Sequence, residues 1–150
     1  MILDAHQLRI ELPAAWSGRI WARAHDVATL HLANYGLSLS DGEFGDASTA
    51  KMAAGGSFLA LTEYRPGAGL APGRGLFAPG RIPRRLDPTA FKSTGLAHPR
   101  AGQVGMQHFF TAARRPFCLY VVLAGPRHAR RGQLAAVDQV LCTLSIRPRE

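Results

Sequence analysis

The sequence predicts an α+β domain: an antiparallel sheet of about six strands, a C-terminal helix packed on one face and one shorter helix. Three observations support this fold class. Short runs rich in β-branched and aromatic residues alternate with turn residues through most of the chain. The run 116–123 is apolar at nearly every position, as expected of a strand buried on both faces. Residues 134–144 repeat apolar side chains at the spacing of an amphipathic helix.

The chain has 150 residues, which suffices for a single domain spanning 1–150 with a hydrophobic core. Hydrophobic residues make up 47% and charged residues 19%, a composition that excludes wholesale disorder. No apolar run approaches the roughly 18 residues of a membrane span. The first residues lack the basic and apolar regions of a signal peptide, which favours the cytoplasm unless the chain is an excised domain of a secreted protein.

The first half of the chain reads as a meander of short strands. Residues 8–12 alternate apolar and polar side chains, the pattern of a half-buried strand. Further strands are expected at 19–23, 28–35 and 57–64. Between the last two, Asp46 or Ser48 is expected to cap a short helix that ends before Gly55.

Residues 65–99 show no sustained periodicity and are rich in Gly, Pro and Arg. They predict a long excursion over the surface, and loops of this length are usually functional or mobile. Single apolar residues are expected to hold it to the core: Leu70, Leu76, Phe77, Ile82, Leu86 and Phe91.

The second half is organised around a predicted hairpin. Its strands are 107–111 and 116–123, joined by a loop of a few residues that contains Arg114 and Arg115. A basic loop is expected at 125–132, followed by the terminal helix and a last short strand at 145–146.

Positive charge is concentrated in the middle of the chain. Residues 65–131 contain twelve basic side chains and a single acid, Asp87, within a chain of net charge +8. Nine arginines of predicted loops are candidates for one basic interaction surface: Arg74, Arg81, Arg84, Arg85, Arg114, Arg115, Arg127, Arg130 and Arg131. Such a surface favours an acidic protein partner or an anionic ligand. Nucleic-acid binding is a weaker alternative, in which Phe77 and Phe91 would stack on bases.

No catalytic, metal or cofactor motif is present in the sequence. It contains no Gly-x-Ser-x-Gly, no phosphate-binding Gly-rich loop that opens a helix, and no His or Cys pair at metal-ligand spacing. We therefore expect a protein without cofactor that is not an enzyme. The alternative is a small-molecule binder or enzyme with a pocket between the sheet and the long loop, formed by His31, Tyr64 and His108.

The two cysteines are expected in the core. Cys118 lies in the apolar run and Cys142 among the helical apolar residues. Reduced buried thiols are the first expectation, with a disulfide between the two as the alternative.

Several short features occur in the order found in one protein group. An early strand runs into Pro13-x-x-Trp16, a middle strand ends at Glu63-Tyr64, and a terminal helix carries Val137-x-x-Val140-Leu141-x-x-Leu144 with Ile146 after it. In this order of elements the chain resembles Mog1/PsbP-like domains. The resemblance implies an antiparallel sheet flanked by helices and a function in binding proteins rather than in catalysis. The long Gly/Pro/Arg excursion departs from that pattern.

The chain is also similar to small stand-alone proteins of GC-rich bacteria, a likeness that implies no activity. Together these observations predict a non-catalytic protein-interaction module that uses the loops 65–99 and 125–132. Homodimer formation through an exposed edge strand is a further alternative.

Overall fold

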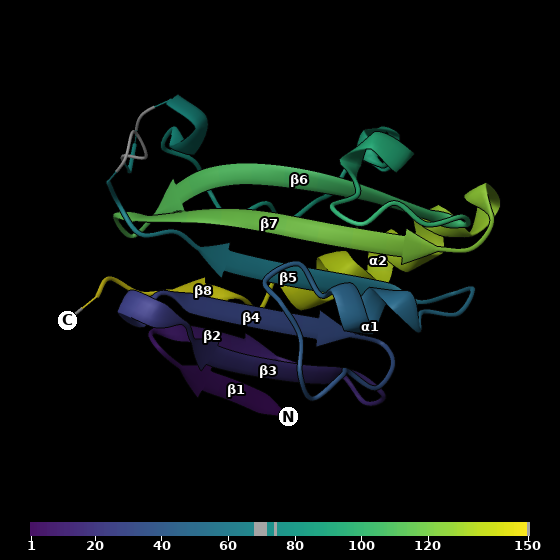
Figure 1. Ribbon diagram of the computed structural model, residues 1–150, viewed down its shortest axis with the longest axis horizontal. Coiled ribbons are helices and arrows are strands. Elements are labelled where there is room, and N and C mark those ends of the chain that lie inside the picture. The colour runs from purple at the N-terminus through teal and green to yellow at the C-terminus, as the bar shows by residue number, and fades with distance from the viewer. Residues whose placement is uncertain (68–71, 74, 150) are drawn as a thin grey trace.

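The computed structural model describes residues 1–67, 72–73 and 75–149. Within them the chain forms two antiparallel sheets, of three and five strands, and two α-helices (Figure 1). The strands are β1 (Ile2–Ala5), β2 (Leu8–Glu11), β3 (Ser17–Ala22), β4 (Ala28–Ala33), β5 (Ser57–Glu63), β6 (Gln103–Ala112), β7 (Arg115–Ala124) and β8 (Ser145–Ile146). The helices are α1 (Asp46–Ala50) and α2 (Arg130–Leu141). The α+β class with one C-terminal and one short helix is confirmed.

The larger sheet has the strand order β3-β4-β5-β7-β6. Every residue of its three central strands, β4, β5 and β7, is buried, which confirms the expectation for 116–123. The register places Tyr120 of β7 opposite Ala60 of β5 and Gln107 of β6. This register decides which side chains share a face, because successive residues of a strand point to opposite faces.

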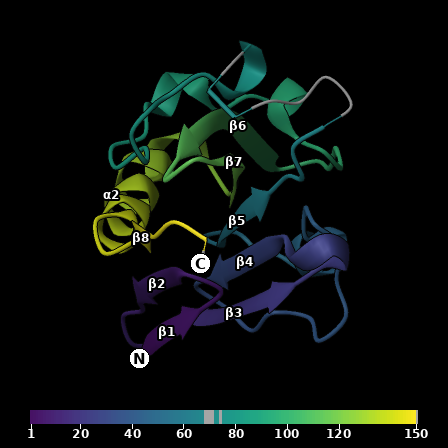
Figure 2. The same ribbon diagram turned by 90° about the vertical axis from the view of Figure 1, so that its left-hand side faces the viewer.

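The smaller sheet, with the order β1-β2-β8, lies on the same face as α2 (Figure 2). Leu134, Val137, Val140 and Leu141 of α2 pack with β2 and with the larger sheet in one hydrophobic cluster. The contact with β3 is close at Gly18, where a Cβ would lie within 2.7 Å of side-chain atoms of three leucines. A larger residue at position 18 would require these leucine side chains to move.

The opposite face of the larger sheet is covered by α1 and the segments around it. Phe58, Ala60, Tyr120 and Val122 form a second hydrophobic cluster with Leu96, against which Tyr35, Leu37, Phe44 and Met52 pack. The sheet is thus enclosed on both sides.

The described residues of the excursion 65–99 pass along the outer edge of β6. Pro79 forms an isolated bridge with Thr111, and Lys92 forms another with Gly105. Of the expected anchors, Phe77, Leu86 and Phe91 are buried, Ile82 is partly buried and Leu76 is exposed, while Leu70 lies outside the described residues. The segment is therefore held at both ends of β6 and against α2.

One strand was not expected, β1, whereas the short strand expected at 145–146 is confirmed as β8. The side chains of β1 are exposed or half-buried, so the sequence has no alternation that would reveal it. The strand forms because His6 and Gln7 adopt left-handed backbone angles, with φ of 50° and 60°, and turn the chain back into β2.

The loops also differ from the expectation. The β6–β7 turn has two residues, Ala113 and Arg114, with φ of 51° and 62°, rather than the longer loop expected. The helix α2 begins at Arg130, so Arg130 and Arg131 are helical and not loop residues. Helix α1 is preceded by Gly45 and has no side-chain cap of its own. Instead, the Asp41 carboxylate accepts hydrogen bonds from the backbone N–H of Ala47 and Ser48.

The cysteines do not share one environment. Cys118 is buried, but Cys142 is exposed, since it follows the last turn of α2 on the side away from the core. The expectation of two core thiols is wrong for Cys142, and both thiols are free. In the part of the chain that the structure describes, no helix has the length and apolar character needed to cross a membrane.

Candidate functional site

The nine arginines expected on one basic surface do not lie together. Arg115 is 3% exposed and forms a two-pronged ion pair with the buried Glu63, with N–O distances of 2.8 and 3.1 Å. Nη2, one of the two nitrogens of this pair, also donates to the backbone oxygen of His6, and Nη1 donates to that of Arg147. Arg115 is therefore a structural residue, and its assignment to a surface was wrong because the β6–β7 turn is shorter than expected.

Arg84 also has a structural contact. Its guanidinium donates to the carbonyl oxygens of Leu141 and Leu144, at 2.5 and 2.9 Å, at the C-terminal end of α2. The Leu141 carbonyl also accepts from the Leu144 N–H, and Leu144 follows the helix. A cation at this end is favourable to the helix dipole. Arg84 thus connects the excursion to the C-terminal end of α2 by two hydrogen bonds.

The remaining arginines lie in separate parts of the molecule. Arg81, Arg85 and Arg114 are exposed, and Arg74 lies outside the described residues. Arg114 occupies the turn before β7, whereas Arg127, Arg130 and Arg131 follow the end of the same strand. The ten residues of β7 separate the two groups by about 30 Å. The basic residues therefore do not form one continuous face.

One small hollow does bring both predicted loops together. Its volume is about 230 Å³, and it is lined by Pro88 and Thr89 from the first loop and by Arg127, Arg130 and Arg131 from the second. We call these five residues the arginine hollow.

The excursion reaches this hollow by running along α2. Arg84 binds the C-terminal end of the helix, and the backbone N–H of Leu86 donates to the Asp138 carboxylate in its middle, at 3.1 Å. Pro88 and Thr89 then lie at its N-terminal end. Asp87 caps the 3₁₀ turn Pro88–Ala90 by accepting hydrogen bonds from the Thr89 N–H and hydroxyl, which lower the pKa of the Asp87 carboxyl.

The arginines of the hollow have no carboxylate partner within the described ranges 1–67, 72–73 and 75–149. The first turn of α2 contains no acidic residue and no side-chain cap. Its arginines therefore lie at the positive end of the helix dipole without a negative charge beside them in that turn. The Nε atom of Arg130 is buried and finds no hydrogen-bond partner among those residues. The site therefore has an excess of positive charge and of hydrogen-bond donors.

The three residues of the expected pocket do not converge. His31 lies in β4 opposite Ala60 and is therefore on the same face as Tyr120 and Gln107. His108 is the next residue after Gln107 in β6, so its side chain points to the other face. The alternating geometry of the sheet thus separates the two histidines.

His31 is 2% exposed and packs edge-on against Trp21 and Phe58. Its Nε2 lies 3.0 Å from the carbonyl oxygen of Glu43, so this nitrogen carries the proton of the neutral ring. Burial lowers the pKa of the imidazole because the charged form is desolvated. These contacts describe a structural histidine.

Tyr64 packs against Phe77 and Phe109, and burial raises the pKa of its hydroxyl to about 12. His108 stacks on Phe110 and lines an open hollow of about 450 Å³ with Lys92, Met106 and Gln107 at the edge of β6. The two residues therefore belong to different surroundings.

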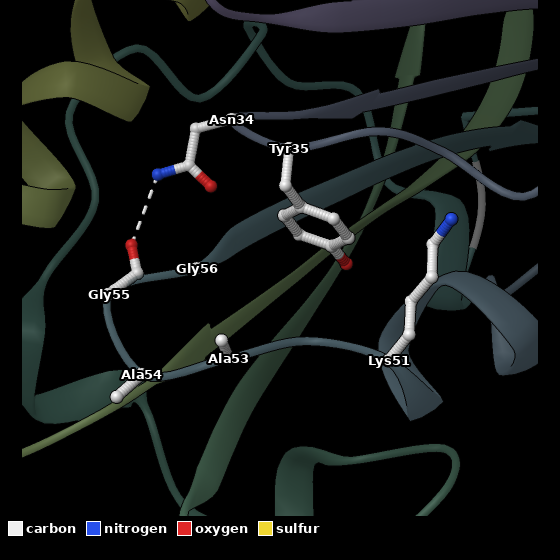
Figure 3. A pocket seen from close by; sticks show the side chains of 7 residues that line it. All are labelled: Asn34, Tyr35, Lys51, Ala53, Ala54, Gly55 and Gly56. Carbon is white, nitrogen blue, oxygen red and sulfur yellow. Dashed lines mark hydrogen bonds between the residues drawn. The ribbon is translucent and has the colours of Figure 1, made fainter.

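A further hollow, of about 290 Å³, lies where the chain leaves β4 and enters β5 (Figure 3). It is lined by Asn34, Tyr35 and Lys51 and by the segment 53–56. Asn34 donates to the Gly55 carbonyl and accepts from the Ser57 N–H, and the Tyr35 hydroxyl donates to the Ser48 carbonyl. Of the three polar side chains that line this hollow, Lys51 is the one without a hydrogen-bond partner among the described residues.

Sequence reasoning found the three arginines of the hollow but missed Pro88 and Thr89. Asp87-Pro88-Thr89 does carry a local signal, because an acidic cap followed by proline is typical of the start of a helical turn. Nothing in that signal shows that the turn packs beside residues 127–131.

Comparison of the chain with protein-family models, with curated proteins and with solved structures finds no match in any of the three. The resemblance to Mog1/PsbP-like domains therefore stays a prediction.

Proposed function

We propose that this protein is a non-catalytic interaction module that binds an acidic protein partner at the arginine hollow. The observation that carries the proposal is the meeting of the two basic loops at Pro88, Thr89, Arg127, Arg130 and Arg131 without a carboxylate partner within the described residues. Other arginines of the chain, such as Arg115 and Arg147, do have carboxylate partners.

Unpaired arginines at this position are unfavourable for the isolated protein. Each cation near the N-terminal end of a helix opposes the helix dipole by about 0.3–1 kcal/mol. Acidic side chains of a partner would offset this repulsion, and arginine is a common residue at the energetic centre of interfaces because its planar group forms paired hydrogen bonds. A local arrangement that lowers stability is expected mainly where it serves a function.

The alternative of a pocket formed by His31, Tyr64 and His108 has lost its geometric support, because these side chains lie on different faces of the sheet and in different surroundings. A protein partner at the arginine hollow is the hypothesis that agrees best with the positions of the charged residues.

The test uses three tagged proteins and lysate of the source organism at low and high salt. They are the wild type, a variant with Arg127, Arg130 and Arg131 changed to Gln, and a matched control with Arg65, Arg81 and Arg114 changed to Gln. Each variant loses three positive charges, and the control positions are exposed. We expect one protein to be retained by the wild type and the control but lost from the hollow variant.

Retention of the same protein by all three would place the interface elsewhere and contradict the proposal. Retention of nuclease-sensitive nucleic acid alone, reduced equally in both variants, would favour the nucleic-acid alternative.

A further inference from the structure

The arginine hollow combines a small volume with three positively charged side chains. Pockets for drug-sized ligands begin at about 300 Å³, whereas this hollow has about 230 Å³ and three arginines among its five lining residues. A whole nucleotide or cofactor exceeds this space. A single anionic group, with part of the molecule that carries it, matches both the volume and the charge.

Within the described residues, neither neighbouring acid forms an ion pair with an arginine of the hollow. Asp87, next to Thr89, has its Oδ1 engaged by the N–H and hydroxyl of that residue, at 2.9 and 2.8 Å. Asp138, two turns further along α2, accepts from the Leu86 N–H instead. His128, exposed between Arg127 and Arg130, adds positive charge when it is protonated.

The donors available to a ligand are side chains rather than the backbone of the helix end. The N–H groups of Ala129 and Arg130 are already bonded to the carbonyl oxygens of Pro126 and Arg127. By contrast, the buried Nε of Arg130 has no partner in the described part of the chain, although a buried donor without a partner is unfavourable.

The number of guanidinium groups distinguishes between anions. A carboxylate has one negative charge and two oxygens, and one arginine can occupy both in a fork. A phosphate monoester carries about −1.5 to −2 charges at neutral pH and three terminal oxygens. Three arginines around one small space therefore match a phosphate monoester better than a carboxylate.

We infer that the arginine hollow binds one phosphate monoester group, held by the side chains of Arg127, Arg130 and Arg131. The inference rests on the proposed function for its choice of surface and deepens it by naming the chemistry recognised. The phosphate could belong to a phosphorylated side chain of a partner or to free phosphate, and the experiment separates these two sources.

The experiment is an NMR titration of the full ¹⁵N-labelled chain in which the amides of Thr89 and of residues 127–131 are followed. The probes are inorganic phosphate, acetate at equal ionic strength, a short phosphoserine peptide and the same peptide with Glu at that position. We expect saturating shifts at these amides with the phosphate-bearing probes and weak, linear shifts with acetate and the Glu peptide.

The Arg130→Gln variant should bind the phosphate probe roughly tenfold more weakly or worse, as expected when a hydrogen bond to a charged group is lost. The control Arg114→Gln, which removes the same charge at the far end of β7, should bind it like the wild type. Tighter binding of the phosphopeptide than of inorganic phosphate identifies a phosphorylated side chain as the source, and the reverse order identifies free phosphate.

Equal, linear shifts with phosphate and acetate would overturn the inference, as would unchanged affinity in Arg130→Gln. Failure here is distinct from failure of the proposed function. If the lysate partner depends on the three arginines while every phosphate probe fails, the interaction module stands without the phosphate site. If phosphate binds and no protein depends on the arginines, the site stands without the protein partner.

Discussion

Glu63 is a buried carboxylate that connects several segments of the fold. Its carboxylate is 1% exposed and accepts two-pronged hydrogen bonds from Arg115 and from Arg149, together with one from the Ala28 N–H at 2.9 Å. Arg115 in turn binds the turn of the first hairpin through His6. One carboxylate thus joins β4, β5 and β7 to the N-terminal hairpin and the C-terminal tail.

We predict that Glu63→Gln lowers the free energy of unfolding by about 3–5 kcal/mol, because Arg115 is then left as a buried charge without a counter-ion. Urea denaturation followed by circular dichroism measures this loss. The control is Glu11→Gln, which changes an exposed carboxylate and should have little effect. An equally small effect at Glu63 would show that the ion pair is not important for stability.

The same carboxylate should make stability depend on pH. Burial alone would raise the pKa of Glu63, but the hydrogen bonds from Arg115, Arg149 and Ala28 outweigh it, so the pKa lies below the usual value of 4.5. A lowered pKa in the folded state means that the stabilisation is complete above about pH 4.5 and is lost as the pH falls through the folded-state pKa. Unfolding midpoints measured from pH 7 to pH 3 should fall more steeply for the wild type than for Glu63→Gln.

The two thiols should differ in reactivity. Burial raises the pKa of Cys118 to about 12, whereas Cys142 is exposed. Since the thiolate is the reactive form, a thiol reagent at pH 8 should label one cysteine in the native protein and two in urea. Mass spectrometry of the labelled peptides identifies the site, and native labelling of Cys118 would contradict the burial of β7.

At the scale of elements, the arginines at the two ends of α2 have opposite effects with respect to the helix dipole. Arg84 at the C-terminal end complements the helix dipole and binds two carbonyl oxygens. Arg127, Arg130 and Arg131 at the N-terminal end oppose the dipole and have no side-chain cap beside them. We expect the first contact to stabilise the packing of the excursion and the second group to reduce the stability of the helix.

We therefore predict opposite effects for two substitutions at α2. Arg131→Glu should raise the free energy of unfolding by about 0.3–1 kcal/mol, because an acidic residue suits the first turn of a helix. Arg84→Gln should lower it by about 1–3 kcal/mol through the loss of charged hydrogen bonds to the helix end. Thermal unfolding measures both, and a loss of stability in Arg131→Glu would contradict the electrostatic account of the hollow.

At the scale of the whole molecule, positive charge is distributed over separate regions. Residues 65–131 hold twelve basic residues, but Arg114 and the arginine hollow lie at opposite ends of β7. We therefore expect weak binding of a polyanion to depend on the total charge, whereas the proposed recognition of a partner depends on the arginine hollow alone.

A duplex oligonucleotide should reveal this distinction. We predict that its affinity falls steeply with salt and decreases by the same factor in the hollow variant and in the matched control, because each loses three positive charges. Fluorescence anisotropy at several salt concentrations measures both effects. A selective loss in the hollow variant would instead make the hollow a nucleic-acid site.

The sequence alone determined the fold class, the buried β7 and the terminal helix, because hydrophobic periodicity is a local property of the chain. Its nine candidate arginines included the three that line the hollow but did not distinguish them from the other six. It did not reveal β1, which depends on a two-residue turn and has no apolar alternation. It also placed Arg115 on the surface, although Arg115 lies beside Glu63, 52 residues away along the chain.

Only the tertiary structure decided which residues meet. The register of β6 on β7 placed His31 and His108 on opposite faces, since a shift of one residue reverses the direction of a side chain. The packing of the excursion along α2 brought Pro88 and Thr89 to Arg127, Arg130 and Arg131. Contacts between segments far apart in the sequence arise from packing of the whole core, and no local pattern encodes them.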